Sequence, residues 1–135
     1  MHEQLTKNTY DSIRWSVGER PSTFKKNDYV VGIDEVGALP QDVEVEIDEL
    51  LEEINEFNGK EITKAAAYFH VKFENIHPFA DGNGRVGRLV LNYFLLIHNH
   101  PPVIIFEQNR KDYFKALEVW DCQQDILPME NFLKE

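Results

Sequence analysis

Apolar residues recur at steps of three and four from residue 43 to residue 120, and this spacing most constrains the fold of the chain. In an α-helix such steps place side chains on one face, so each run predicts a helix with one buried side. Four runs follow the rule, over residues 43–57, 62–76, 85–98 and 110–120. A length of 135 residues is typical of one domain, so the runs predict a mostly α-helical single-domain bundle.

The helical runs differ in how they distribute their apolar side chains. Residues 43–57 carry one apolar stripe on a helix otherwise rich in Asp and Glu, which is typical of a solvated helix face. Residues 85–98 are nearly apolar on all sides, so we expect this helix at the centre of the domain. A weaker helical pattern covers residues 5–17, and a short helix is expected at the C-terminal end.

Residues 21–41 interrupt the helical pattern with glycine and proline around a short apolar stretch. Because glycine and proline punctuate secondary structure, this segment predicts a small β-hairpin or a loop, which we call the flap. The expected organisation is one domain over residues 1–135, with its core over about 12–121.

Charge and cysteine content exclude several classes of protein. Asp and Glu number 24 against 14 Lys and Arg, and a net charge of −10 argues against nucleic-acid binding, which favours a basic surface. Cys122 is the only cysteine and the N-terminus has no signal-like apolar run, so we expect a cytoplasmic protein. The longest apolar run, Leu89 to Ile97, is too short to span a bilayer, so no membrane span is expected.

The segment from His77 to Arg88 concentrates residues that bind anions. Gly82–Gly84 lies directly before a predicted helix, where backbone N–H groups and the positive end of the helix dipole attract negative charge. Arg85 and Arg88 are three residues apart, so both can extend from one helix face toward the same phosphate groups. The pattern predicts an active-site loop over 77–88 that holds several phosphates.

Three further side chains of this loop have distinct expected roles. A single carboxylate beside phosphates is a common way to hold Mg²⁺, so Asp81 is the candidate metal ligand. His77 is the candidate general base, because an imidazole can take a proton from an attacking hydroxyl near neutral pH. Phe79 is an aromatic residue within a polar loop, and we expect it to anchor the loop by packing.

Other chemistries fit the sequence poorly. No Ser or Thr neighbours His77 in the sequence, which disfavours a serine hydrolase. The histidines lack the spacing of a zinc site, and no Cys and His cluster completes one. The glycine loop also lacks the Lys-Ser/Thr ending of the P-loop and the spacing of the Rossmann fingerprint. Transfer of part of a nucleotide is the reaction favoured by the remaining residues.

The segment from His77 to Arg88 is similar at every specified position to the signature H-x-F-x-[DE]-G-N-G-R-x-x-R of the Fic family within the Fic/Doc fold. The resemblance implies a Fic-type helical domain that moves AMP from ATP to a Ser, Thr or Tyr hydroxyl of a target protein and releases pyrophosphate. By this resemblance His77 deprotonates the hydroxyl, and Asp81 coordinates Mg²⁺. Nucleotide phosphates are implied to contact five residues: Gly82, Asn83, Gly84, Arg85 and Arg88.

The resemblance also implies roles outside the motif. Family members hold a target segment as an added strand on a flap, and Tyr29, Val30 and Val31 lie where that flap is expected. Tyr113 and Asp121 fall where family members line the adenine pocket, although the usual residue at the second position is Asn. The choice of nucleotide is therefore open.

Control and alternative activities are open as well. Many Fic proteins carry an inhibitory motif, [ST]-x-x-x-E-[GN], but none of the seven Ser and Thr residues here has Glu four positions later. We expect either a separate inhibitory protein or a chain that is a fragment, and a homo-oligomer is possible. At the same site, alternatives are transfer of UMP or phosphocholine, removal of AMP by hydrolysis, and a nucleotide-sensing module that binds a partner without catalysis.

Overall fold

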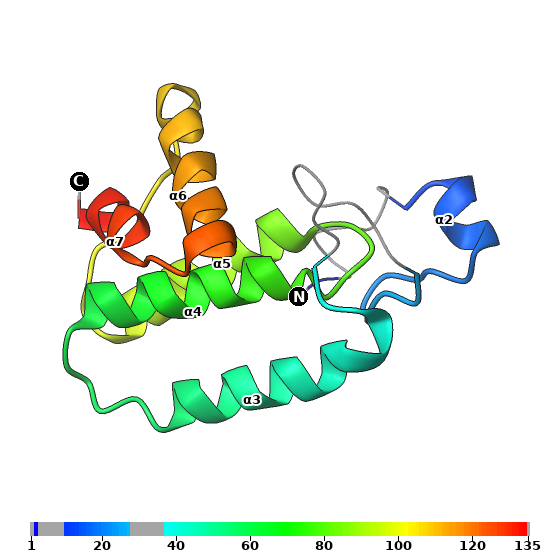
Figure 1. Cartoon of the computed structure of the whole chain (residues 1–135), viewed down its shortest axis with the longest axis horizontal. Helices are drawn as coiled ribbons and strands as arrows, with labels where there is room; N and C mark the ends of the chain where they lie inside the picture. Colours follow the sequence, from blue (N-terminus) through cyan, green and yellow to red (C-terminus); the bar gives the residue numbers. More distant parts are fainter. Residues whose placement is uncertain (1, 3–9, 28–36, 135) are drawn as a thin grey trace.

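The computed structural model describes residues 2, 10–27 and 37–134, and these residues are mostly helical (Figure 1). The elements in chain order are α2 (Ser12–Ser16), η1 (Pro40–Asp42), α3 (Val43–Asn55), α4 (Ile62–Ile76), α5 (Asn83–Ile97), η2 (Glu107–Asn109), α6 (Arg110–Gln123) and α7 (Leu127–Lys134). The predicted helical class is confirmed, and α3 to α6 agree with the four runs of apolar spacing to within three residues at each end.

Helix α4 lies at the centre of the bundle and contacts α3, α5, α6 and α7. Its Ala66, Ala67 and Val71 are almost completely buried, and their small side chains let the neighbouring helices approach closely. The main core surrounds them with Leu91, Phe94, Leu95, Tyr113, Ala116, Met129 and Leu133. Two of these residues belong to α7, so the core continues past residue 121.

The expectation that residues 85–98 form the central helix is wrong. Helix α5 buries one side against α4, but four large apolar residues on it are at least 45% exposed: Leu89, Tyr93, Leu96 and Ile97. The physical reason is that α3 packs on α4 rather than on α5. An apolar groove of about 300 Å³, lined by residues of α3, α4 and α5, lies between them.

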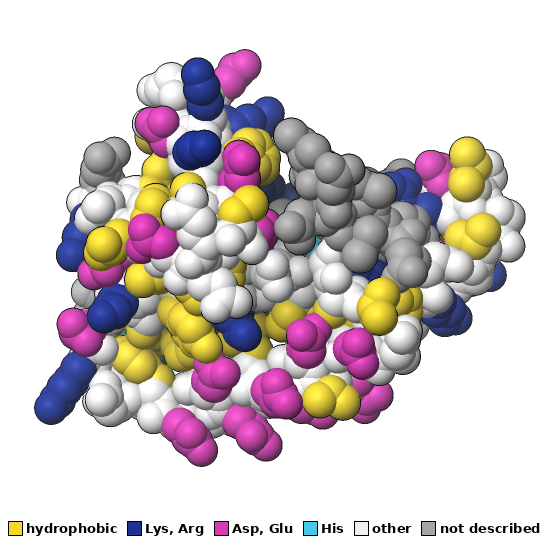
Figure 2. Space-filling view, in the orientation of Figure 1, with side chains coloured by type: hydrophobic (Ala, Val, Ile, Leu, Met, Phe, Trp, Pro, Cys, Tyr) yellow, Lys and Arg dark blue, Asp and Glu magenta, His cyan; other side chains and the backbone are white. Residues whose placement is uncertain are grey.

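Helix α3 carries the solvated acidic face that the sequence predicts. Val43 and Leu50 are buried in a small second core with Ile76, next to the active-site loop. Most of the carboxylates of α3 are exposed, and Figure 2 shows acidic side chains along the edge of the molecule that α3 forms. This second core fixes α3 against the C-terminal end of α4, where the candidate site begins.

The described parts of the flap, residues 21–27 and 37–41, contain turns, bends and part of η1 but no strand. Tyr29, Val30 and Val31 lie outside the described residues, so the hairpin stays a prediction. Within the part of the chain that the structure describes, no helix combines the length and the apolar character needed to cross a membrane.

Candidate active site

The predicted active-site loop connects α4 to the first turns of α5. His77 ends α4 with a φ of 52°, and Gly82 precedes α5 with a φ of 83°, so both ends of the connection are left-handed. Glycine adopts this conformation freely, whereas histidine does so at a cost of roughly 1 kcal/mol or more. Pro78 follows His77 and cannot continue the helix. The tight connection brings His77 next to the N-terminal end of α5.

Asn83 stabilises this connection from within. Its side-chain Oδ1 accepts a hydrogen bond from the N–H of Phe79 at 2.8 Å, and its Nδ2 donates to the carbonyl of Phe79 at 2.7 Å. Both ends of the amide are therefore committed, and the residue is only 4% exposed. Asn83 could contribute to phosphate binding through its backbone N–H, whereas its side chain shapes the loop.

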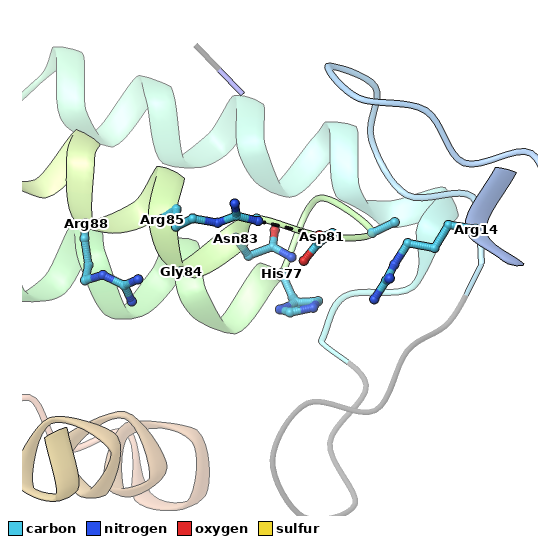
Figure 3. Close-up of a pocket in the computed structure, with 9 residues that line it drawn as sticks. Arg14, His77, Asp81, Asn83, Gly84, Arg85 and Arg88 are labelled. Carbon is cyan, nitrogen blue, oxygen red and sulfur yellow. Dashed lines mark ion pairs between the residues drawn. The ribbon is translucent and has the colours of Figure 1, made fainter. Parts of the chain in front are cut away.

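A cavity of about 450 Å³ opens at the N-terminal end of α5 (Figure 3). It is lined by every motif residue to which the sequence assigns chemistry: His77, Asp81, Gly82, Asn83, Gly84, Arg85 and Arg88. Arg14 and Ala80 complete the lining, and Asp81 forms an ion pair with Arg85 at 3.5 Å. A helix N-terminus, the guanidinium groups of Arg85 and Arg88 and one imidazole thus converge on one cavity, a set of groups suited to a polyphosphate, and Arg14 adds a third guanidinium group to the wall.

Gly84 makes room for the second arginine of the motif. A Cβ atom added at Gly84 would lie 2.9 Å from Nη1 of Arg88, so the guanidinium group passes close over the glycine. Residues four apart face the same side of a helix, and long side chains lean toward the helix N-terminus, which explains the contact. The glycine therefore serves the position of Arg88 as well as the backbone.

The environment of His77 keeps its imidazole neutral. Its pKa is lowered to about 4, chiefly by burial and further by the positive charge of Lys25, while Asp81 acts in the opposite direction. At pH 7 the ring therefore carries no charge and can accept a proton. This state is the one that a general base requires.

Gly37 packs directly against the last turn of α4 and the Cβ atom of His77. A Cβ atom added at Gly37 would lie 2.9 Å from Cβ of His77 and 3.0 Å from the carbonyl oxygen of Ile76, and the φ of Gly37 is 71°. The neighbouring Ala38 donates its N–H to the same carbonyl at 3.1 Å. The backbone at 37 and 38 thus covers the last turn of α4 and supports the position of the histidine.

Three residues that precede the flap or begin it, His2, Tyr10 and Lys25, also contact the active-site loop. His2 donates from Nε2 to the carbonyl of Asp81 at 2.7 Å, and the N–H of Asp81 donates to the Tyr10 hydroxyl at 3.3 Å. The ring of His2 stacks on Phe79 at 3.8 Å, and Lys25 donates its N–H to the carbonyl of Pro78 at 2.8 Å. Phe79 therefore packs on the N-terminal segment and lies outside the two buried helical core clusters.

Tyr113 and Asp121 lie on α6 and do not line the cavity. Tyr113 is 1% exposed, and its hydroxyl lies 2.6 Å from Nε2 of His70 within the main core. Asp121 is half-buried and accepts a hydrogen bond from Nδ2 of Asn75 at 2.8 Å. Burial raises the pKa of Asp121, and the hydrogen bond from Asn75 opposes that shift. Their role in binding the adenine of a nucleotide stays a prediction.

Glu74 is a buried carboxyl group that the sequence analysis did not single out. It lies so close to Gly87 that a Cβ atom added there would collide with the carboxyl group. Burial raises the pKa of Glu74 to about 8; Arg88 lowers it and Asp121 raises it further. The second glycine of the Gly-Arg-Val-Gly-Arg stretch thus accommodates a mostly protonated carboxyl group beside Arg88.

Arg14 and Gly37 also escaped the sequence analysis. Neither residue belongs to a recognisable spacing, and each is dozens of residues from the motif. The only available signals were weak ones: a glycine in a segment rich in breaks, and an arginine in a marginal helical run. The fold alone brings them to the loop.

Comparison with known proteins finds sequences and folds that are similar to this chain. A family model described as Fic/DOC family matches residues 1–95. A protein from Aedes aegypti named "Protein adenylyltransferase Fic" is 44% identical over 72 residues, which make up 53% of this chain and 14% of that protein. The chain thus spans a small part of the length of the curated relative that it matches.

Two solved structures resemble the fold. A Fic-domain-containing signalling protein from Bacteroides thetaiotaomicron matches with a TM-score of 0.74 at 23% identity, over 86% of this chain and 51% of that chain. A Fic family protein from Desulfovibrio desulfuricans matches with a TM-score of 0.72 at 26% identity, over 98% of this chain and 41% of that chain. The helical arrangement around the loop is therefore one that solved proteins share.

Proposed function

Since the chain belongs to the Fic/DOC family, we propose that it transfers AMP from ATP to a hydroxyl side chain of a target protein and releases pyrophosphate. The proposal rests on one observation above all: a neutral imidazole, His77, lines the same cavity as Arg85 and Arg88. The name of the Aedes aegypti relative supports AMP as the transferred group.

The phosphate groups of ATP would occupy the N-terminal end of α5. In this proposal the backbone N–H groups of Gly82–Gly84 bind the α- and β-phosphates. Arg85 and Arg88 neutralise the negative charge that develops on pyrophosphate as it leaves. Such fixed charges stabilise the transition state of phosphoryl-type transfer more than the ground state, and they would supply most of the rate enhancement.

Asp81 is the residue that would hold Mg²⁺. Among the described residues no group of three or more His, Cys, Asp or Glu could enclose a metal ion. Mg²⁺ bound with a nucleotide does not need such a group, because one or two carboxylates, phosphate oxygens and water complete its octahedron. The Asp81 carboxylate on the cavity wall therefore fits the ion, which would neutralise phosphate charge when bound.

The chemical step assigns one role to His77. The imidazole takes the proton of the target hydroxyl while the hydroxyl oxygen forms a bond to the α-phosphorus. The bond between that phosphorus and the bridging oxygen breaks, and pyrophosphate departs on the opposite side. A positioned base typically contributes about 10²- to 10⁴-fold to such a reaction, and in-line placement of the reactants contributes further.

Two labelled forms of ATP test the proposal. With label on the α-phosphorus, we expect a labelled protein in an extract incubated with the chain and Mg²⁺, and with label on the γ-phosphorus we expect none beyond the labelling of the same extract without the chain. Label from the γ position would instead indicate phosphoryl transfer, and label from α-labelled UTP alone would indicate a different nucleotide. If no donor of this panel labels any protein, the proposed transfer is contradicted. An identical reaction with excess EDTA is the control for Mg²⁺.

The pH dependence of the reaction should be unusual for a histidine base. Because the pKa of His77 is lowered from 6.5 to about 4, the neutral form persists well below pH 6. We expect kcat/KM to stay nearly constant from pH 7 to about pH 5 and then to fall as pH falls through about 4. Circular dichroism at each pH would show that the fold persists. An inflection near pH 6.5 would contradict the assigned environment of His77.

A further inference from the structure

Arg14 contributes the third guanidinium group of the cavity, and it comes from a different part of the chain than the other two. It lies on α2, whereas Arg85 and Arg88 lie on α5. Figure 3 shows Arg14 on the opposite side of His77 and Asp81 from the two motif arginines. The imidazole therefore lies between a phosphate-binding side and a second positive side of the same cavity.

The contacts of Arg14 leave its Nη2 atom without a partner among the described residues. Asp11 accepts the Arg14 N–H at 2.8 Å and forms an ion pair with Nη1 at 3.3 Å. The Nε atom is buried and has no hydrogen-bond partner among the described residues. A carboxylate that enters the cavity can therefore reach Nη2 but not the buried Nε.

The sequence segment that contains Arg14 is basic, in contrast to the chain as a whole. Residues 10–27 contain four Lys and Arg against two Asp and Glu, in a chain whose net charge is −10. The positive charge of Lys25 reaches His77, where it lowers the pKa of the imidazole. The positive charges of Arg14 and of the buried Lys25 favour a negatively charged group on this side of His77.

The direction from which the hydroxyl attacks connects these observations, and the inference rests on the proposed function. In an in-line transfer the attacking oxygen and the leaving group lie on opposite sides of the phosphorus. If pyrophosphate departs toward Arg85 and Arg88, the hydroxyl arrives beside His77 from the side of Arg14. We propose that Arg14 binds a carboxylate of the target segment close to the modified hydroxyl, so that the preferred substrate is an acidic segment.

A charge exchange between enzyme and substrate tests this role. Two matched sets of synthetic peptides each carry one Ser, Thr or Tyr, flanked by Glu in one set and by Lys in the other. With α-labelled ATP we expect the wild type to label the Glu set at least about tenfold faster. Arg14→Glu should reverse the preference. Arg14→Lys should retain it in weaker form, because Lys keeps the positive charge but lacks the planar guanidinium group.

Lys26→Glu is the matched control, because it makes the same change of charge in the same segment at an exposed residue that does not line the cavity. It should leave the preference between the peptide sets within about twofold of the wild type. The KM for ATP is the second readout. We expect Arg14→Glu to leave it nearly unchanged, whereas Arg88→Gln should raise it.

Three outcomes have separate meanings. Equal labelling of both peptide sets by the wild type would overturn the inference. A raised KM for ATP in Arg14→Glu, with an unchanged peptide preference, would also overturn it and would make Arg14 a phosphate ligand. If the wild type labels neither the peptides nor any protein of an extract, the failure lies with the proposed transfer itself. Label on extract proteins but on neither peptide set would reject a short acidic segment as the substrate.

Discussion

Replacement of His77 should reduce the proposed transfer of AMP by about 10²- to 10⁴-fold while ATP still binds. Among the described residues that line the cavity, His77 is the only one whose side chain is an uncharged imidazole that can accept a proton. Arg85, Arg88 and the backbone of the loop remain in place in such a variant, so the nucleotide site persists. The measurement is kcat from α-labelled ATP, together with the dissociation constant of ATP.

The choice of substitution decides how clearly this result can be interpreted. His77 has a φ of 52°, a conformation that Asn tolerates better than most residues. His77→Asn therefore keeps the backbone and removes the base, whereas His77→Ala also changes the conformational preference. Both variants should lose activity, and only the second should lose measurable stability. More than a tenth of the wild-type rate in His77→Asn would show that another group takes the proton.

Gly37→Ala should lower kcat by about 10²-fold although it substitutes no residue of the motif. The added methyl group would lie 2.9 Å from Cβ of His77 and 3.0 Å from the carbonyl oxygen of Ile76. Neither atom is the end of a flexible side chain, so the backbone around the histidine must move. A displacement of the base by about 1 Å is enough for an effect of this size.

Gly59→Ala is a matched control for this variant. Gly59 has a φ of 83°, similar to the 71° of Gly37, but a Cβ atom there would meet nothing within 4 Å. Both substitutions strain a left-handed residue at a cost of roughly 1–2 kcal/mol, which thermal unfolding would report. Only Gly37→Ala should lose activity. Equal activity in the two variants would show that the contact with His77 has no catalytic consequence.

The helices could be predicted from the sequence because the signal is local. Steps of three and four apolar residues define α4 within the stretch that forms it, without reference to other parts of the chain. The centre of the bundle could not be predicted in the same way. Residues 85–98 are the more apolar run, yet Ala66 and Ala67 let four helices approach α4, and this is a property of packing.

The same distinction applies to the candidate site. The motif places the imidazole, the carboxylate, the glycines and two arginines within twelve residues, so its chemistry could be inferred from the sequence. The role of the Asn83 side chain could not be inferred from the sequence. An amide can bind a phosphate as well as a backbone, and only the structure shows that this one binds the backbone of Phe79. Arg14 and Gly37 approach from remote segments, and only the folded chain shows their positions.

The backbone contacts of Asp81 would link the proposed catalysis to a local opening equilibrium. Its carbonyl is held by His2 and its N–H by Tyr10, which are 79 and 71 positions away in sequence. Contacts of this kind are lost when one segment detaches, even while a helical core persists. The active loop would then be fully ordered only in molecules in which His2 and Tyr10 keep these contacts. A substitution that removes either contact would lower the fraction of competent enzyme while the melting temperature of the helical bundle stays the same.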